Sequence, residues 1–293
     1  MVDRKRKSEP ALTLGQITER PRLKIREYMD LAQHRFIFVC GLHRSGTSVL
    51  FRSLREHPQV SGFQGTASPE DEGMHLQTVY LPSGHYGGAG EFGFHPEAHL
   101  TESSSLVTDA NRQKLLSERS RYWDLSKTYL LEKSPPNIIR TRFLQAMCPN
   151  SYFIIMLRHP LAVSYATQKW YRKYKINWRG FPRIFEHWLV CNEIFRADQK
   201  HLKHSFVVKY EEFVADPHKW ISDIYRFLGL SEFSMNQEII SGANNRYFEL
   251  WQRKHSGFFS GRMNRKIVEQ YEERVRCFGY SLIDLNWIGP ILD

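Results

Sequence analysis

The sequence predicts a three-layer α/β/α fold in which helices cover both faces of a central parallel β-sheet. Its 293 residues suffice for one large α/β domain, and an apolar fraction of 41% is enough for a packed core. Short apolar runs, typical of buried strands, alternate with segments of helical spacing, and no Pro-, Gly- or Ser-rich linker divides them. We expect one domain over residues 35–293, after a basic flank over residues 1–34 that is partly disordered or helical.

The first predicted unit is a strand, a glycine-containing turn and a helix. Residues 35–40 form an apolar run that ends at a glycine, which is the pattern of a buried strand. A polar turn over residues 41–48 follows. Apolar residues then recur at helical spacing up to Leu54, and Pro58 ends this helix because proline cannot continue it.

The next segment, residues 62–93, is expected to be irregular. It holds eight of the chain's 18 glycines, a composition typical of lids and binding walls. A second strand is predicted over residues 128–132. Pro135 then opens a helix that continues through Leu144.

The second half of the chain repeats the alternation of strands and helices. Residues 151–157 form the clearest buried strand, and a helix follows it through Trp170. A long helix over residues 182–203 precedes a fourth strand over residues 205–209, and a further helix covers residues 217–228. Because helices separate consecutive strands, the strands should run parallel.

The net charge of +10 is too spread out to indicate a nucleic-acid interface. Residues 1–35 carry nine Lys or Arg and five Asp or Glu, a balance of +4, and the other +6 is distributed along the chain. The basic run Arg4–Lys7 resembles a nucleic-acid-binding or targeting tag, but a solvated, disordered tail explains it more simply. A charge of this kind suits a small polyanion.

Other classes of protein are also disfavoured. No run approaches the roughly 20 apolar residues of a membrane helix, so no membrane span is expected. The basic N-terminus lacks the apolar segment of a secretory signal. The four cysteines are widely spaced and form no CxxC pair, which speaks against a zinc ribbon or a disulfide framework. We therefore expect a cytoplasmic protein.

The turn over residues 41–48 has the spacing of a phosphate-binding loop. Nucleoside-triphosphate loops need lysine where this chain has Thr47, and no later strand ends in the aspartate that would hold Mg²⁺. The loop therefore favours a donor that bears a 5′-phosphate and needs no metal, although an ordinary strand–turn–helix is the alternative. Its candidate ligands are Arg44, Ser45, Gly46, Thr47 and Ser48.

The segment Arg44–Thr47, the helix after it and Pro58 resemble the 5′-phosphosulfate-binding loop of the sulfotransferase superfamily, whose fold is P-loop-NTPase-like. The resemblance is nearest to the tyrosylprotein-sulfotransferase-like and bacterial-type branch. It implies 3′-phosphoadenosine 5′-phosphosulfate (PAPS) as co-substrate, adenosine 3′,5′-bisphosphate (PAP) as product and no metal. Residues 35–293 would be the sulfotransferase domain. Many animal members are Golgi-anchored, and a trimmed form of one would look the same.

The family resemblance also implies a 3′-phosphate site. In the family an arginine at a strand end and a serine on the next helix hold this phosphate, and Arg158 and Ser164 match them. The family serine usually stands where this chain has Ala166, so Thr167 is an alternative to Ser164. The segment over residues 209–212 also resembles the family, and the resemblance implies that Tyr210 lies near the adenine. The basic pair at residues 253–254 is a weaker match, which implies that Lys254 lies near the 3′-phosphate.

A base must remove the proton of the acceptor hydroxyl. Family carbohydrate sulfotransferases carry a glutamate in the region of the acidic run here, and the spacing selects Glu72, with Glu70, Asp71 and His75 as alternatives. The three adjacent acids should repel one another and raise one pKa. The tyrosylprotein branch has its glutamate where this chain has Gln64, which argues against tyrosine as the acceptor.

A strand-end lysine completes the predicted machinery. Lys133 lies in a segment that resembles a family motif whose lysine contacts the bridging oxygen of the donor, and Arg44 would assist it. A salt-bridged structural lysine is the alternative.

The sequence thus predicts a PAPS-dependent sulfotransferase in which Glu72, Lys133 and Arg44 are catalytic. The acceptor would be a hydroxyl of a carbohydrate or small alcohol, or of a peptide, and no nucleic acid is expected as partner. The rival predictions are a P-loop kinase that uses ATP and Mg²⁺, and a basic nucleic-acid-binding protein.

Overall fold

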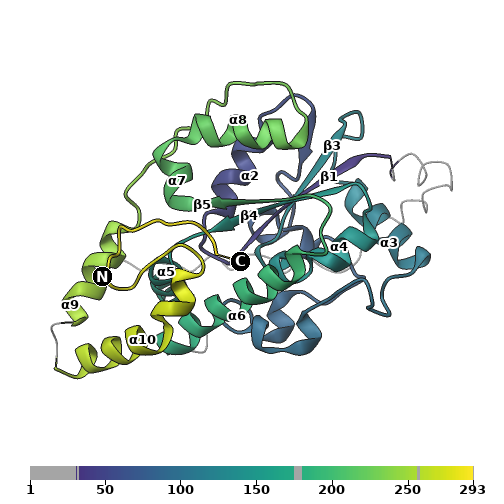
Figure 1. Cartoon of the computed structure of the whole chain (residues 1–293). Coiled ribbons are helices and arrows are strands. Elements are labelled where there is room, and N and C mark those ends of the chain that lie inside the picture. The colour runs from purple at the N-terminus through teal and green to yellow at the C-terminus, as the bar shows by residue number, and fades with distance from the viewer. Residues whose placement is uncertain (1–30, 32, 175–179, 256–257, 293) are drawn as a thin grey trace, which may run out of the picture.

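The computed structural model describes residues 31, 33–174, 180–255 and 258–292 (Figure 1). Its centre is a five-stranded parallel sheet with the strand order β2-β3-β1-β4-β5, which confirms the predicted fold class. The predicted flank over residues 1–34 lies almost entirely outside the described residues. The strands are β1 (Arg35–Gly41), β2 (Val60–Gly62), β3 (Tyr129–Lys133), β4 (Ser151–Leu157) and β5 (Ser205–Lys209).

Helices cover both faces of this sheet. Figure 1 shows α2 and α8 on one face and α4 and α6 on the other, while α9 and α10 pack together at one end of the molecule. In the part of the chain that is described, no helix combines the length and the apolar character needed to cross a bilayer. The helices are α2 (Thr47–Arg55), α3 (Asp109–Ser120), α4 (Thr141–Met147), α5 (Pro160–Tyr174), α6 (Phe181–Gln199), α7 (Tyr210–Ala215), α8 (Pro217–Leu228), α9 (Asn245–His255) and α10 (Phe258–Arg276).

The central strands are buried on both faces. Every residue of β1 after Arg35 and every residue of β3 is buried, and the ring of Phe38 on β1 stacks on Phe153 of β4 with 5.4 Å between centroids. A sheet covered by helices on both sides requires such continuous apolar runs. This is why the strand predictions agree with the structure to within one residue at each end.

Several elements differ from the sequence-based expectation. The sequence did not lead us to expect α7, α9 or α10, and the helix expected over residues 182–203 ends at Gln199. The pattern did not indicate β2, which has only three residues, or α3, which buries only Leu115, Leu116 and Arg119 and so lacks a clear apolar stripe. The continuous helix expected from Pro135 to Leu144 is wrong. A 3₁₀ turn ends at Arg140, whose φ of −133° is not helical, and α4 begins after it.

Candidate active site

Adjacent strands end at one edge of the sheet, and the residues that follow them meet there. The register pairs Val39 of β1 with Lys133 of β3, and Gly41 of β1 with Met156 of β4. The loop after β1 therefore lies between Lys133 on one side and Arg158, which follows β4, on the other. Ligands of open α/β sheets bind at this edge.

The loop after β1 turns tightly into α2. Arg44 and Gly46 have positive φ angles of 70° and 102°, and the Ser45 hydroxyl donates to a backbone carbonyl of the loop at 2.7 Å. A Cβ atom on residue 46 would lie 2.5 Å from the Tyr210 ring, so glycine is required at this close approach. Thr47 begins α2, whose first amides have no partner within the helix and can bind an anion.

A cavity of about 310 Å³ opens beside this loop. We call it the loop cavity. The predicted site residues and alternatives that line it are Arg44, Thr47, Ser48, Glu70, Glu72, His75 and Thr167. Much of the remaining wall is apolar or small: Pro69, Met74, Gly84, Gly88, Ala89, Pro135 and Trp170.

Glu72 and Lys133 form an ion pair at this cavity. Lys133 Nζ lies 3.0 Å from Glu72 Oε1, and the two residues are 1% and 7% exposed. Burial raises the pKa of Glu72, and the positive charge of Lys133 opposes this rise without cancelling it. The residue predicted as base and the residue predicted to neutralise charge are therefore in direct contact.

The other acids of the run have different surroundings. The Asp71 carboxylate accepts hydrogen bonds from the Gly65 and Thr66 amides and from the Thr66 hydroxyl. Burial raises the pKa of Asp71, but these bonds outweigh it and leave the pKa below its ordinary value. Glu70 lines the cavity. Burial, and only to a small extent repulsion from Glu70, raises the pKa of Glu72, so the expected repulsion is a minor cause.

Arg158 connects the loop to the segment that precedes α9. Its Nε and Nη2 donate to Asn244 Oδ1 at 2.9 and 2.7 Å, and its Nη1 donates to the Arg44 carbonyl oxygen at 2.8 Å. Its guanidinium lies 4.1 Å from the centre of the Tyr210 ring. A guanidinium has five N–H groups, so these bonds within the described chain leave one N–H on each terminal nitrogen.

The candidates on α5 and α9 lie at different depths. Ser164 is fully buried, and its hydroxyl has no hydrogen-bond partner among the described residues. Thr167, three residues later, lines the loop cavity, so a ligand there would meet Thr167 first. Lys254 Nζ lies 4.9 Å from the centre of the Tyr165 ring, on the neighbouring helix.

Two residues of the site carried no recognised signal in the sequence. His43 lines the loop cavity, and its Nδ1 is buried with no hydrogen-bond partner in the described chain. Burial, and then the charges of Lys133 and Arg44, lower the pKa of His43 to about 3, so its imidazole is neutral. Its place in the phosphate-type loop could have identified it. Asn244, the partner of Arg158, lies in an irregular segment where no periodicity points to it.

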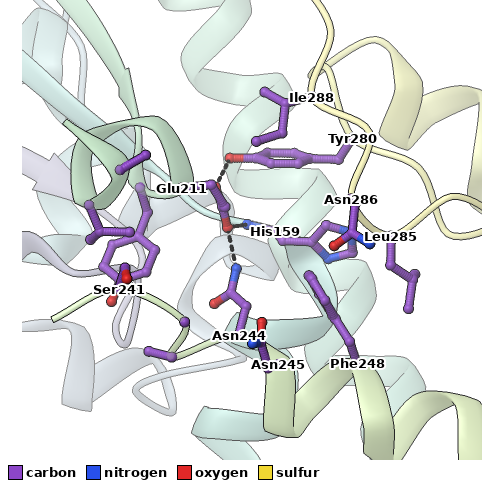
Figure 2. A pocket seen from close by; sticks show the side chains of 15 residues that line it. His159, Glu211, Ser241, Asn244, Asn245, Phe248, Tyr280, Leu285, Asn286 and Ile288 are labelled. Atoms are coloured by element: carbon purple, nitrogen blue, oxygen red, sulfur yellow. Dashed lines mark hydrogen bonds between the residues drawn. The ribbon is translucent and has the colours of Figure 1, made fainter.

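A second cavity, of about 200 Å³, begins at Tyr210, whose ring also contacts the loop at Gly46. Figure 2 shows Glu211 in this cavity, where it accepts hydrogen bonds from Asn244 Nδ2 at 2.5 Å and from the Tyr280 hydroxyl at 2.7 Å. Most of the other polar side chains that line this cavity carry amide or hydroxyl groups. Further lining residues are Ser241, Asn245, Phe248 and Asn286.

No group of three or more His, Cys, Asp or Glu side chains in the described ranges is arranged to hold a metal ion.

Comparison with known proteins adds a family to this geometry. The model of a family described as "Sulfotransferase family" matches residues 37–234. Protein-tyrosine sulfotransferase 2 from Gallus gallus is 27% identical over 217 residues, which cover 70% of this chain and 54% of the chicken protein. The chain thus spans about half the length of the curated relative it matches.

The solved structures that the comparison found are more distant in sequence. Sulfotransferase STF9 from Mycobacterium avium has a TM-score of 0.47 and 14% identity, with 80% of this chain and 71% of that chain covered. Mouse sulfotransferase SULT7A1 complexed with PAP has a TM-score of 0.40 and 13% identity, with 79% and 71% covered. Likeness at this level does not extend to individual residues.

Proposed function

This chain belongs to the sulfotransferase family, and from that premise we propose that it transfers a sulfonate group from PAPS to an acceptor hydroxyl. The observation that carries the proposal is the buried ion pair of Glu72 with Lys133, which lies at a cavity bordered by a phosphate-type loop. One side chain of this pair can accept a proton, and the other can neutralise an anion. Transfer to a hydroxyl needs both at one place.

In the proposed reaction, a Glu72 carboxylate oxygen takes the proton of the acceptor hydroxyl. The acceptor oxygen forms a bond to sulfur, while the bond between sulfur and the bridging phosphate oxygen breaks and PAP departs with that electron pair. Once Glu72 is protonated, it no longer neutralises Lys133, 3.0 Å away. The ammonium charge is then available to the leaving phosphate, and Arg44, which lines the same cavity as Glu72, would assist it.

The donor would lie along the sheet edge. The amides at the start of α2, with Ser45, Gly46, Thr47 and Ser48, would hold its 5′-phosphate. The two remaining N–H groups of Arg158 would hold the 3′-phosphate, assisted by Ser164 or Thr167 and by Lys254. Tyr210 links the loop to the cavity of Figure 2, whose amide and hydroxyl groups suit the uncharged adenine.

Ligand binding tests the donor class directly. We expect PAP to raise the melting temperature more than ATP with Mg²⁺ at equal concentration, because Thr47 stands where a triphosphate loop needs lysine. A ligand present at 100 times its Kd stabilises the folded state by about 2.7 kcal/mol. Stronger stabilisation by ATP–Mg²⁺ would favour the kinase. Tight, salt-sensitive DNA or RNA binding that Arg44→Ala leaves intact would favour the nucleic-acid-binding protein.

Replacing Arg158 should affect the 3′-phosphate selectively. For Arg158→Ala we expect PAP affinity to fall by about 10- to 100-fold, the worth of hydrogen bonds to a charged group, while 5′-AMP affinity changes by less than about threefold. Calorimetric titration of both nucleotides measures this. Loss of the contacts to Asn244 and Arg44 would weaken both ligands alike, so an equal loss for PAP and 5′-AMP would contradict the assignment.

The proposed acceptor is a hydroxyl of a carbohydrate or small alcohol. The exposed Trp170 and small residues such as Gly84, Gly88 and Ala89 line the loop cavity together with its acids, and an aromatic ring suits the C–H face of a sugar. The likeness to the chicken protein-tyrosine sulfotransferase favours a peptide tyrosine as a second candidate. Labelled PAPS offered to sugars, alcohols and tyrosine peptides distinguishes them, since transfer to peptides alone would reject the first.

A further inference from the structure

The Ser134 hydroxyl connects the segment that carries Glu72 to the end of β3 by hydrogen bonds. The Met74 amide donates to Ser134 Oγ at 2.9 Å, and Ser134 Oγ donates to Glu132 Oε1 at 2.5 Å. The second bond runs from the hydroxyl to Glu132 when this glutamate is ionised, because an ionised carboxylate can only accept. Asn137 Nδ2 donates to the other oxygen, Glu132 Oε2, at 2.7 Å. Glu132, Ser134 and Asn137 are completely buried.

Gly73 sets the distance between this segment and the strand. A Cβ atom on residue 73 would lie 2.4 Å from Glu132 Cγ and Oε1, so the backbone rests directly on the Glu132 side chain. Arg119, itself 1% exposed, donates from Nη2 to the Gly73 carbonyl oxygen at 3.3 Å and lies 4.0 Å from Glu132 Oε1. The carbonyl and the amide of the single peptide group between Gly73 and Met74 are therefore both held by groups that converge on Glu132.

Glu132 and Lys133 are consecutive residues of β3, and both contact the segment around Glu72. Lys133 contacts the Glu72 carboxylate, and Glu132 supports the backbone of the next two residues. A shift of this backbone would move the Glu72 carboxylate away from Lys133. Misplacement of a reacting group by about 1 Å can cost about 100-fold in rate.

We propose that Glu132 is a positioning residue that acts through Ser134 and Gly73 to hold the Glu72 carboxylate against Lys133. This inference rests on the proposed function, in which Glu72 is the base. Glu132 does not line the loop cavity in the described chain and takes no part in the transfer itself. Its buried carboxylate accepts two hydrogen bonds and lies near Arg119, and these interactions fix the segment.

Ser134→Ala and Glu132→Gln test the proposal. Ser134→Ala removes the hydroxyl that links Glu132 to the Met74 amide, and Glu132→Gln replaces one of the two accepting oxygens with a donating amide group. For both variants we expect kcat to fall about 10- to 100-fold while PAP affinity stays within about twofold. The acid limb of the pH profile should move to higher pH, because a Glu72 carboxylate farther from Lys133 loses the charge that lowers its pKa. The other charged neighbours of Glu72, namely His75, Glu70 and Glu132, are unchanged in Ser134→Ala.

Ser151→Ala is the matched control. Ser151 is also a completely buried serine, at the start of β4, but its hydroxyl has no partner in the described part of the chain. Its removal should leave kcat and the acid limb unchanged. Ser134→Thr keeps the hydroxyl and should retain most of the activity that Ser134→Ala loses. A general loss of stability would not produce this difference between the two variants.

The possible outcomes distinguish failure of the positioning role of Glu132 from failure of the proposed sulfotransferase function. A wild-type protein that transfers no label from PAPS to any acceptor contradicts the proposed function. An active wild type together with a Ser134→Ala protein of unchanged kcat and acid limb overturns the positioning role. If Ser134→Ala does not fold, Asn137→Ala, which removes only the bond to Glu132 Oε2, takes its place under the same criteria.

Discussion

Replacing Glu72 with alanine should lower turnover by at least about 100-fold while PAP affinity stays within about twofold. A general base typically contributes about 10²- to 10⁴-fold, and Glu72 contacts Lys133 rather than the loop that would hold the nucleotide. Single-turnover transfer from labelled PAPS and calorimetric titration with PAP measure the two quantities. Loss of PAP binding in proportion to turnover would indicate a role for Glu72 in holding the donor.

Glu70→Ala and His75→Ala are the controls for this assignment. Both residues line the same cavity, but neither is the carboxylate paired with Lys133. We expect each to keep turnover within about tenfold of wild type. An active Glu72→Ala enzyme with an inactive Glu70→Ala or His75→Ala enzyme would move the base to that residue.

The pH profile gives a second readout of the same base. Glu72 must be deprotonated to accept a proton, so kcat/KM should be lost as the pH falls through its pKa. Burial raises that pKa above the ordinary value of 4.5 for a glutamate, despite the opposing charge of Lys133. The acid limb should therefore lie above the range of an exposed glutamate and vanish in Glu72→Ala. A limb at or below the ordinary value would contradict burial as the dominant influence.

Local patterns predicted the parts of this fold that are buried continuously. The strand over residues 151–157 was predicted with its correct bounds, because a run of six apolar residues with a helix after it has few other solutions. The sequence did not predict α3 because only three of its 12 residues are buried. It did not predict the break at Arg140 because apolar spacing continues across it. Its cause lies in a tertiary contact: the buried Arg140 Nε donates to the Ala98 carbonyl oxygen, 42 residues away.

The sequence predicted residues of the candidate site only where they belong to a contiguous motif. Glu72 and Lys133 were each selected by resemblance, and their pairing across 61 residues depends on how the irregular segment folds over β3. The contact of Asn244 with Arg158 spans 86 residues and begins in a segment without regular structure. Glu132 lay in the recognised motif, but its role as a support depends on a glycine that is far away in the chain.

Replacing Lys133 with methionine should cost both stability and turnover. The change leaves the Glu72 carboxylate buried without its cation, and breaking a buried ion pair destabilises a protein by about 3–5 kcal/mol. Turnover should fall by about 100- to 1,000-fold, because the charge on the leaving phosphate loses its nearest ammonium group. Denaturant unfolding and single-turnover transfer measure the two losses.

The double variant Glu72→Leu/Lys133→Met separates these two effects. Apolar side chains of similar volume can replace a buried pair with little or no loss of stability, so the double variant should regain most of the stability that Lys133→Met loses, and none of the turnover. The single variant should also become more stable as the pH falls. Without the cation, burial raises the pKa of Glu72 further above its unfolded value, and protonation removes the buried charge. A Lys133→Met protein with wild-type turnover would show that this lysine is structural, with Arg44 left to neutralise the leaving phosphate.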